Sequence, residues 1–348
     1  MEPRKIHLDL LRIFAIFSMV VIHVSAQNWY SVAVSSREWQ WFNLYDSLAR
    51  FCIPAMVMIS GTLFLNPAKP LPYSQLYRKY ILRLVTAFIF WSLLYALVNT
   101  ILLPIFRHEP VNFVLFQRAA LFGEYHLWFV FMMIGLYLIT PLLRNITMDK
   151  ALAEYFLVLW LIFGIVFSFA SLIPKFEEIK TLLEKADIHF VIGFSGYFVL
   201  GWYLSCTPVK KPYEYAIYGL GLVGVLLTFF LTRSSSLAGD KADGLFYNNF
   251  SPTVMAASVA VFVFFNQRVS KWRFSEKAQR MILQLSSCCF GIYLIHVFSI
   301  MALGALGLNS LSLSAPLSVP ILSLLVFLIS FGVILLLRKI PLFRKYLS

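Results

Sequence analysis

Charged side chains are scarce in this chain of 348 residues. Only 13% of the sequence is Asp, Glu, Lys or Arg, and 16 acidic residues stand against 29 basic ones. Soluble domains are about one quarter charged. Hydrophobic residues reach 60%, and the mean hydropathy is +0.79. The scarcity of charge therefore excludes a sizeable soluble domain and predicts an all-α polytopic integral membrane protein.

Cysteine and the common catalytic motifs are also in short supply. The four cysteines show no CxxC spacing, and at least three fall in apolar stretches, which argues against a disulfide framework or a zinc site. We predict that they are small core residues and that there is no metal site. Walker, GxSxG and HExxH patterns do not occur, so the chemistries that depend on them lose support.

Ten stretches have the length and apolarity of membrane spans. Placing the N-terminus in the cytoplasm assigns 19 basic residues to inner segments and eight to outer loops, with Arg12 and Arg50 completing the 29. The positive-inside rule then predicts that both termini are cytoplasmic. The predicted spans cover about 8–25, 44–65, 80–103, 125–143, 151–174, 188–205, 213–232, 250–266, 280–303 and 317–338.

The first of these stretches also has the outline of a signal peptide. Arg4 and Lys5 precede an apolar run, and residues 24–26 fit a cleavage site. Arg12 interrupts the apolar run, which argues against cleavage, but charge counting leaves the alternative open because cleavage would not alter the later topology.

Arg12 and His23 lie inside the first span, where ionisable side chains are costly and are functional candidates by default. Eleven residues at roughly 100° each come to about 20° past three turns, so both project from one helix face, roughly 16 Å apart. Asp9, three residues before Arg12, can pair with it. The alternative is structural: Arg12 as a snorkelling anchor and His23 as an interfacial helix end.

The second span carries an internal ion pair and a packing motif. Asp46 and Arg50 are four residues apart, the spacing of a salt bridge on a helix. Pro54 predicts a kink, and Ser60 with Gly61 permits close helix approach. We interpret Asp46, Arg50, Ser60 and Gly61 as structural.

Three further clusters border the spans. Arg78, Lys79 and Arg83 enter the third span from the predicted inner side, which is usual for lipid-phosphate anchoring and less common for binding a phosphorylated cofactor. Residues 124–129 open the fourth span at the predicted outer side, where an aromatic belt with His126 and Trp128 is the simplest interpretation. Residues 291–296 place a tyrosine and a second intramembrane histidine one turn apart in the ninth span.

Taken together, these segments resemble the bacterial acyltransferase-3 family of membrane O-acyltransferases, and the resemblance spans the chain. It is closest to the short, tail-less polysaccharide or glycolipid O-acetyltransferases. The matching elements are Arg12 and His23 with ten residues between them, residues 60–65 with Thr62 in place of the usual aromatic, Arg78 and Arg83, residues 126–129, and residues 291–296.

The resemblance implies a single membrane-embedded acyltransferase domain over residues 1–348. It implies an acyl donor, usually acetyl-CoA, that reaches the site from the cytoplasm as a substrate, with no permanently bound cofactor. The acceptor would be a hydroxyl of a cell-surface glycan or lipid-linked sugar at the outer side of a bacterial inner membrane. Membrane lipids are expected partners, nucleic acid is not, and a homo-oligomer is left open.

The same resemblance distributes roles among the candidate residues. His23 would be the general base and Arg12 would bind or orient the donor. Donor phosphates would meet Arg78, Lys79 and Arg83. The remaining candidates are expected to line the site: His126, Trp128, Tyr293 and His296.

Two other functions stay open at this stage. A transporter or flippase for a glycan intermediate or small solute would use the same buried charges as a substrate or proton path, although no convincing inverted repeat is present. A membrane subunit that senses a small ligand is the third. The sequence does not identify the acceptor or distinguish acetyl from succinyl or longer acyl groups.

Overall fold

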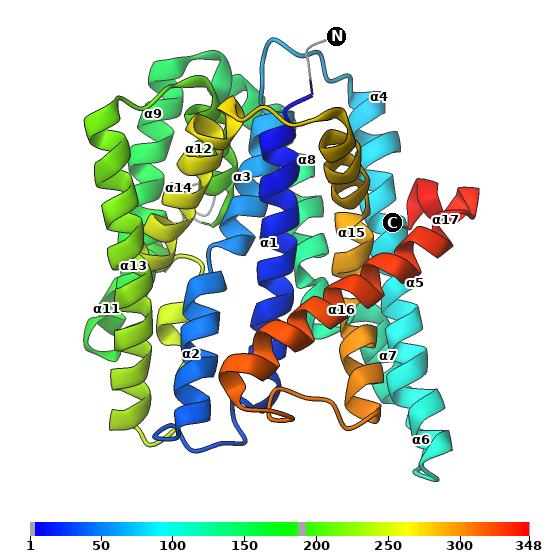
Figure 1. Ribbon diagram of the computed structural model, residues 1–348. Helices are drawn as coiled ribbons and strands as arrows, with labels where there is room; N and C mark the ends of the chain where they lie inside the picture. Colours follow the sequence, from blue (N-terminus) through cyan, green and yellow to red (C-terminus); the bar gives the residue numbers. More distant parts are fainter. Residues whose placement is uncertain (1–3, 187–192, 348) are drawn as a thin grey trace.

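The computed structural model describes residues 4–186 and 193–347, which are helical and contain no strand (Figure 1). Within these residues, nine helical runs are long and apolar enough to cross a membrane, so the predicted all-α polytopic fold is confirmed. The predicted span 188–205 begins at residues outside the described part of the chain. The nine runs are Ile6–Asn28, Arg37–Phe64, Tyr73–Phe106, Phe113–Met148, Lys150–Ala170, Lys211–Ala238, Leu245–Lys271, Glu276–Ala305 and Ala315–Leu337.

Thirteen α-helices in the described part of the chain have ten or more residues. These are α1 (Ile6–Ser25), α2 (Arg37–Ala49), α3 (Cys52–Phe64), α5 (Leu82–Leu97), α7 (Phe113–Phe122), α8 (Trp128–Met148), α9 (Lys150–Leu159), α11 (Glu177–Ala186), α12 (Phe194–Cys206), α13 (Lys211–Ala238), α14 (Pro252–Gln267), α15 (Glu276–Ala305) and α16 (Ala315–Leu337).

Shorter elements extend or join these helices. The short α-helices are α4 (Tyr73–Gln75), α6 (Leu103–Phe106), α10 (Ser168–Ala170) and α17 (Pro341–Tyr346). The 3-10 turns are η1 (Ala26–Asn28), η4 (Tyr125–Leu127), η6 (Pro174–Phe176), η7 (Leu245–Tyr247) and η8 (Val269–Lys271). The π-helical segments are η2 (Leu76–Ile81), η3 (Val98–Leu102) and η5 (Trp160–Phe167).

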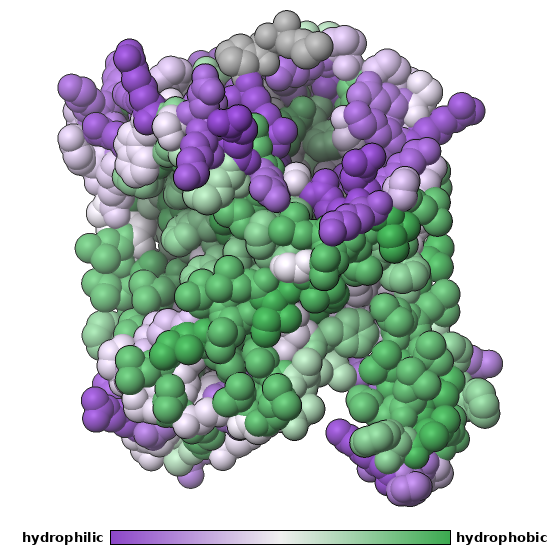
Figure 2. Space-filling model, turned by 45° about the vertical axis from the view of Figure 1, so that its right-hand side comes forward, coloured by the Kyte–Doolittle hydropathy of each residue, from purple (hydrophilic) through white to green (hydrophobic). Residues whose placement is uncertain are grey.

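The first helix, α1, lies at the centre of the bundle and packs against α2, α3, α15 and α16 (Figure 1). Figure 2 shows a broad apolar belt between polar side chains at the two ends of the molecule. This arrangement fits a bilayer, because only the ends meet water. It also means that the polar residues of α1 face other helices and not lipid.

The predicted kink in the second span is a break between two helices. The α2 helix ends at Ala49 and α3 begins at Cys52. Pro54 falls in the first turn of α3, where its missing N–H costs no hydrogen bond. The break leaves Arg50 between the two helices, and the ring of the next residue, Phe51, stacks on Phe14 in the middle of α1.

Close packing of α3 against α12 depends on two glycines. A Cβ atom at Gly61 would lie 1.7 Å from the carbonyl oxygen of Phe198, and one at Gly201 would lie 2.1 Å from that of Met58. The hydroxyl of Thr62 donates to the carbonyl of Gly201 at 2.9 Å. Small residues at such contacts let two backbones approach in the membrane, in line with the structural interpretation of Gly61.

Glycines at 219, 221 and 224 spell GxGxxG, the pattern of a nucleotide-binding loop. They lie in the middle of α13 and not in a loop between a strand and a helix. Added Cβ atoms at Gly221 and Gly224 would meet α14, at 2.3 Å from Ala260 Cβ and 2.5 Å from the carbonyl oxygen of Thr253. The pattern therefore serves helix packing.

One detail of the cysteine prediction is wrong. Cys52, Cys288 and Cys289 are buried free thiols, as expected of small core residues. Cys206 is a free thiol as well but is exposed at the end of α12. The end of a membrane helix meets the polar boundary, so an apolar sequence environment does not guarantee burial there.

The orientation in the membrane remains a prediction, and both chain ends lie in the upper half of Figure 1. We expect Lys210→Cys and Lys345→Cys to resist a membrane-impermeant maleimide added outside intact cells, because the basic excess places both inside. Lys241→Cys, in a predicted outer loop, is the matched position that should react. All three cysteine variants are made in a Cys206→Ser background, because the exposed Cys206 thiol would otherwise react with the maleimide. Labelling of position 210 or 345 from outside would reverse the orientation.

Candidate active site

A cavity of about 320 Å³, the larger of two that adjoin along α1, lies beside the first half of this helix. Two arginines, Arg12 and Arg83, line it, one from α1 and one from α5. Volumes of this order are typical of small-molecule sites. The other polar or aromatic lining residues are Ser60, Phe64, Tyr80, Phe129, Tyr137, Ser286, Ser287, Phe290 and Tyr293.

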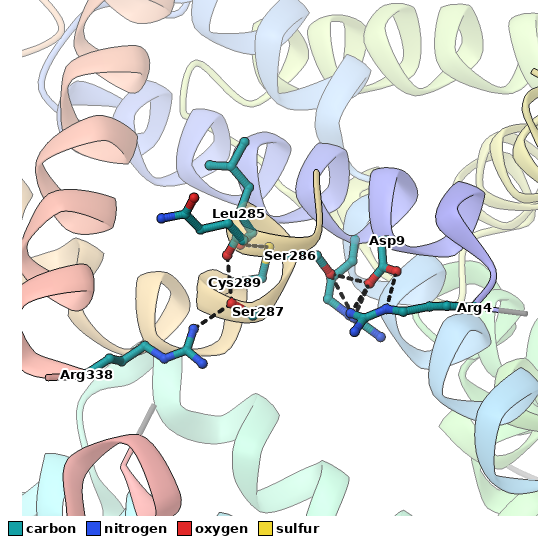
Figure 3. A network of polar contacts seen from close by, with 9 residues as sticks. Arg4, Asp9, Leu285, Ser286, Ser287, Cys289 and Arg338 are labelled. Carbon is teal, nitrogen blue, oxygen red and sulfur yellow. Dashed lines mark hydrogen bonds and ion pairs between the residues drawn. The ribbon is translucent and has the colours of Figure 1, made fainter. Parts of the chain in front are cut away.

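Arg12 is held by a hydrogen-bond network that joins α1 to α15 (Figure 3). Its Nη1 donates to Asp9 Oδ1 at 3.2 Å and to Ser286 Oγ at 2.9 Å. Ser286 in turn donates to Asp9, and Arg4 binds both carboxylate oxygens of Asp9 at 2.9 and 3.0 Å. The predicted pair of Asp9 and Arg12 is present, and Arg12 is fixed with part of its guanidinium facing the cavity.

The basic cluster before the third span separates into two environments. Arg83 lines the cavity, with its guanidinium 5.4 Å from the ring centroid of Phe290. Arg78 and Lys79 lie in the π-helical segment η2, are exposed and do not line the cavity. Arg338 from α16 adds a cation close by and donates to Ser287 Oγ at 2.6 Å (Figure 3).

A second, much smaller cavity of about 30 Å³ lies further along α1, around His23. It has room for one or two water molecules. His126 and Trp128 also line it, as does Cys52. The small cavity shares four lining residues with the large one, so the two adjoin: Ile16, Met56, Phe129 and Tyr293.

Three histidines from three different elements meet at the small cavity. The ring centroids of His23 and His296 are 4.9 Å apart, and those of His126 and His296 are 5.0 Å apart. His126 and His296 are buried, while His23 is half-buried. The ring of Tyr125 lies 5.4 Å from that of His23 at the side of the cluster. His23 is therefore the member that reaches the cavity with the most free surface.

Backbone carbonyls fix the proton positions on two of these rings. His296 Nδ1 lies 2.7 Å from the carbonyl oxygen of Tyr293, and His126 Nε2 lies 3.4 Å from that of Leu294. A carbonyl oxygen only accepts, so these nitrogens carry the N–H in the neutral rings. The opposite nitrogens, His296 Nε2 and His126 Nδ1, are buried without a hydrogen-bond partner among the described residues. Neutral His126 and His296 thus offer lone pairs to the cluster.

Tyr293 connects the cluster to both cavities. Its hydroxyl donates to the carbonyl oxygen of His126 at 2.5 Å, which ties α15 to the turn η4 before α8. The predicted lining residues His126, Trp128 and Tyr293 all line the small cavity, and His296 packs directly against the rings of His23 and His126.

The residues interpreted as structural divide between helix packing and cavity walls. Gly61 packs against α12, whereas Ser60 lines the large cavity and donates to the carbonyl of Met56 at 3.0 Å. Asp46 and Arg50 form a two-contact ion pair, at 2.5 Å from Arg50 Nε to Asp46 Oδ1 and 2.7 Å from Nη2 to Oδ2. This pair lies beyond His23 and lines a third cavity.

Several residues that line or support the cavities have no role in the sequence-based predictions. Ser286 and Ser287 interrupt an apolar span, and both line the large cavity and bind arginines. Arg4 binds Asp9. The available signal was the Ser–Ser pair itself, since hydroxyls inside a span need partners. No group of three or more His, Cys, Asp or Glu side chains in residues 4–186 and 193–347 converges as metal ligands would.

Fold and cavities together define a multi-pass membrane protein with a polar interior that runs from two arginines to a histidine cluster. Comparison with protein-family models matches residues 6–338 to the acyltransferase-3 family, described as an acyltransferase domain. The chain belongs to this family and is a membrane acyltransferase. Searches of curated proteins and of solved structures found no significant match.

Proposed function

We propose that the protein transfers an acetyl group from cytoplasmic acetyl-CoA to a hydroxyl of a cell-surface glycan or lipid-linked sugar at the outer face of a bacterial inner membrane. The observation that carries the proposal is the adjoining pair of cavities, with arginines at one end and His23 at the other. The family match supplies the reaction class.

The large cavity supports a donor that is anionic at one end. Arg12 and Arg83 present guanidinium groups, which bind phosphate and amide oxygens in directed hydrogen bonds. A volume of about 320 Å³ suits the pantetheine arm of CoA, with the nucleotide outside the bundle. Arg78 and Lys79, exposed on η2, are available to that outer part of the donor.

The small cavity supports a short acyl group. At about 30 Å³ it accommodates only a few non-hydrogen atoms beside His23. An acetyl group fits this space better than a succinyl group or a longer chain, because Met19, Met56 and Phe129 close around it. Close packing in protein interiors makes even one added methylene costly.

The proposed chemistry needs a base at the acceptor and a proton for the leaving group. His23 takes the proton from the acceptor hydroxyl while that oxygen attacks the thioester carbonyl, so a C–O bond forms and the C–S bond breaks. The imidazolium then returns the proton to the CoA thiolate. His126 and His296 pack against His23 and each keeps one buried ring nitrogen without a hydrogen-bond partner among the described residues.

Acetyl-CoA consumption by the purified protein tests the proposal. An acyltransferase releases free CoA in the presence of an acceptor extract, and the acetyl label appears as an ester in the glycan fraction. A transporter or flippase would move its substrate without releasing CoA. Failure to release CoA with extracts of the native cell envelope would overturn the proposed function.

Two arginine variants test whether the acetyl-CoA donor binds in the large cavity. We expect Arg83→Ala to raise the KM for acetyl-CoA by roughly tenfold, with a smaller effect on kcat, because a lost charged hydrogen bond is worth about 1.5–3 kcal/mol. Arg78→Ala is the control, since Arg78 is exposed outside the cavity and should raise KM less than threefold. Steady-state kinetics measure both. Equal effects at the two positions would point to general attraction of phosphates and not to a cavity contact.

A further inference from the structure

A third cavity, of about 490 Å³, lies beyond His23, in the lower half of Figure 1 where α1 ends and α2 rises beside it. The proposed donor site and the histidine cluster lie in the other two cavities. Its walls come from four separate segments of the sequence. They are formed by Ala26, Trp29, Tyr30, Asp46, Arg50, Leu172, Gly244, Leu245, Tyr247 and Asn248.

This third cavity is next to the histidine cluster. Ala26 follows His23 by three residues, which is one helical turn. Arg50 precedes Cys52, a lining residue of the small cavity, by two positions. A molecule in the third cavity would therefore approach His23 from the side opposite to Arg12 and Arg83.

The two charged residues that line the third cavity, Asp46 and Arg50, form an ion pair with no net charge. Some of their polar atoms remain available for hydrogen bonds. Arg50 binds Asp46 through Nε and Nη2, and its guanidinium lies 4.3 Å from the ring centroid of Tyr247. Arg50 Nε and Asp46 Oδ1 are in ion-pair contact but have no hydrogen-bond partner among the described residues. Asp46 is 2% exposed, so its negative charge is balanced by Arg50 and is not solvated by water. The other lining residues carry no charge.

Aromatic side chains make up much of the remaining wall. Trp29 and Tyr247 are buried with ring centroids 5.5 Å apart, and Tyr30 stands at the rim with 84% of its surface exposed. A pyranose ring has an apolar C–H face and a rim of hydroxyls. Aromatic rings can pack against the apolar C–H face. The Arg50 guanidinium and the Asn248 side chain can supply the hydrogen-bond partners that buried sugar hydroxyls require.

We propose that the third cavity binds the acceptor as a neutral pyranose ring, stacked on the aromatic wall and hydrogen-bonded by Arg50. The inference rests on the proposed function for the direction of transfer, but the sugar-binding step is separate from it. An acidic sugar is disfavoured because its carboxylate would meet Asp46, whose partner is already committed. Arg50 thus has a binding role in addition to the structural one expected from the sequence.

Sugar binding can be measured on the purified protein without any donor. The probes are methyl hexopyranosides such as methyl α-glucopyranoside, compared with methyl glucuronopyranoside, in a detergent that has no sugar headgroup. Saturation-transfer NMR reports which ring protons lie against the protein. We expect neutral glycosides to receive saturation and the uronoside to receive little.

Two tyrosine variants provide the matched test. Tyr30→Ala removes an exposed aromatic ring at the cavity rim and should weaken neutral glycoside binding by roughly five- to tenfold. Tyr73→Ala removes a similarly exposed ring, 69% accessible, at the opposite end of the molecule and should change nothing. Arg50→Lys keeps the charge beside Asp46 but removes the planar fork, and should weaken binding by a similar factor.

The outcomes separate this inference from the proposed function. Absence of glycoside binding, a preference for the uronoside, or equal affinities of Tyr30→Ala and Tyr73→Ala would overturn the inference even if acetyl-CoA is consumed. Conversely, neutral glycoside binding that depends on Tyr30 would uphold it even if no acetyl group is transferred, and the proposed function alone would then fail.

Discussion

His23→Asn is expected to lower the turnover of acyl transfer by roughly 10²–10⁴-fold, the usual contribution of a general base. Asparagine keeps a polar side chain against His296 but lacks a basic nitrogen. Affinity for acetyl-CoA should stay within threefold of the original, because the arginines that line the donor cavity are untouched. Turnover and donor affinity of the detergent-purified variant provide the measurement.

The matched control is His108→Asn. His108 is exposed in a loop with a backbone φ of 56°, a conformation that asparagine adopts readily. It should retain full turnover, and melting curves of both variants should overlay that of the original protein. Near-normal turnover in folded His23→Asn would contradict the general-base mechanism and leave His23 as a structural helix end.

Gly61→Ala is expected to lower the free energy of unfolding by about 3 kcal/mol, the upper end for a methyl group inserted into a packed interior. The reason is that the new Cβ would lie 1.7 Å from the backbone carbonyl oxygen of Phe198. A backbone atom cannot rotate aside as a side chain does, so α3 and α12 must separate. Thermal unfolding followed by size-exclusion fluorescence measures the loss.

Gly135→Ala is the control for this substitution. Gly135 lies within α8 with no atom within 4 Å of an added Cβ. Alanine there should be neutral or stabilising by up to about 1 kcal/mol, because alanine favours the helix. Equal melting temperatures of the two variants would show that the contact between α3 and α12 tolerates separation.

The sequence was sufficient to place Arg12 and His23 along one helix that borders two cavities. The spacing of Arg12 and His23 predicts one helix face, and both residues do line adjoining cavities. The prediction worked because α1 is a regular helix from Ile6 to Ser25, so 3.6 residues per turn holds throughout. His126 and Tyr293 were expected to line the site and are also found there.

The sequence could not predict that Arg83 lines the cavity while Arg78 and Lys79 do not. Arg78 and Lys79 lie in a π-helical segment, whose hydrogen bonds run from i to i+5 and whose turn is wider than that of an α-helix. The angle that relates them to Arg83 therefore differs from the usual 100° per residue. No local sequence pattern indicates the change from α-helix to π-helix. Only the packed structure shows that Arg83 is the member of this cluster that lines the cavity.

The cavity and aromatic contacts of Arg50 could not be predicted from the sequence for a different reason. The spacing from Asp46 predicts the ion pair correctly, but the aromatic partner Tyr247 lies 197 positions later in the chain, at the end of a 3-10 turn. Contacts between segments so distant have no signature in the spacing of residues. The break between α2 and α3, which exposes the Arg50 side chain to the cavity, follows from tertiary packing as much as from Pro54.

The small volume of the cavity around His23 has an electrical consequence. Across an energised membrane, each elementary charge that crosses 100 mV releases about 2.3 kcal/mol. A wide wet passage from Arg12 to His23 would let protons and ions leak through the bundle. Met56, Phe129 and Tyr293 line both cavities, and the cavity around His23 has a volume of only about 30 Å³. Packing this close would insulate the two faces of the membrane from each other.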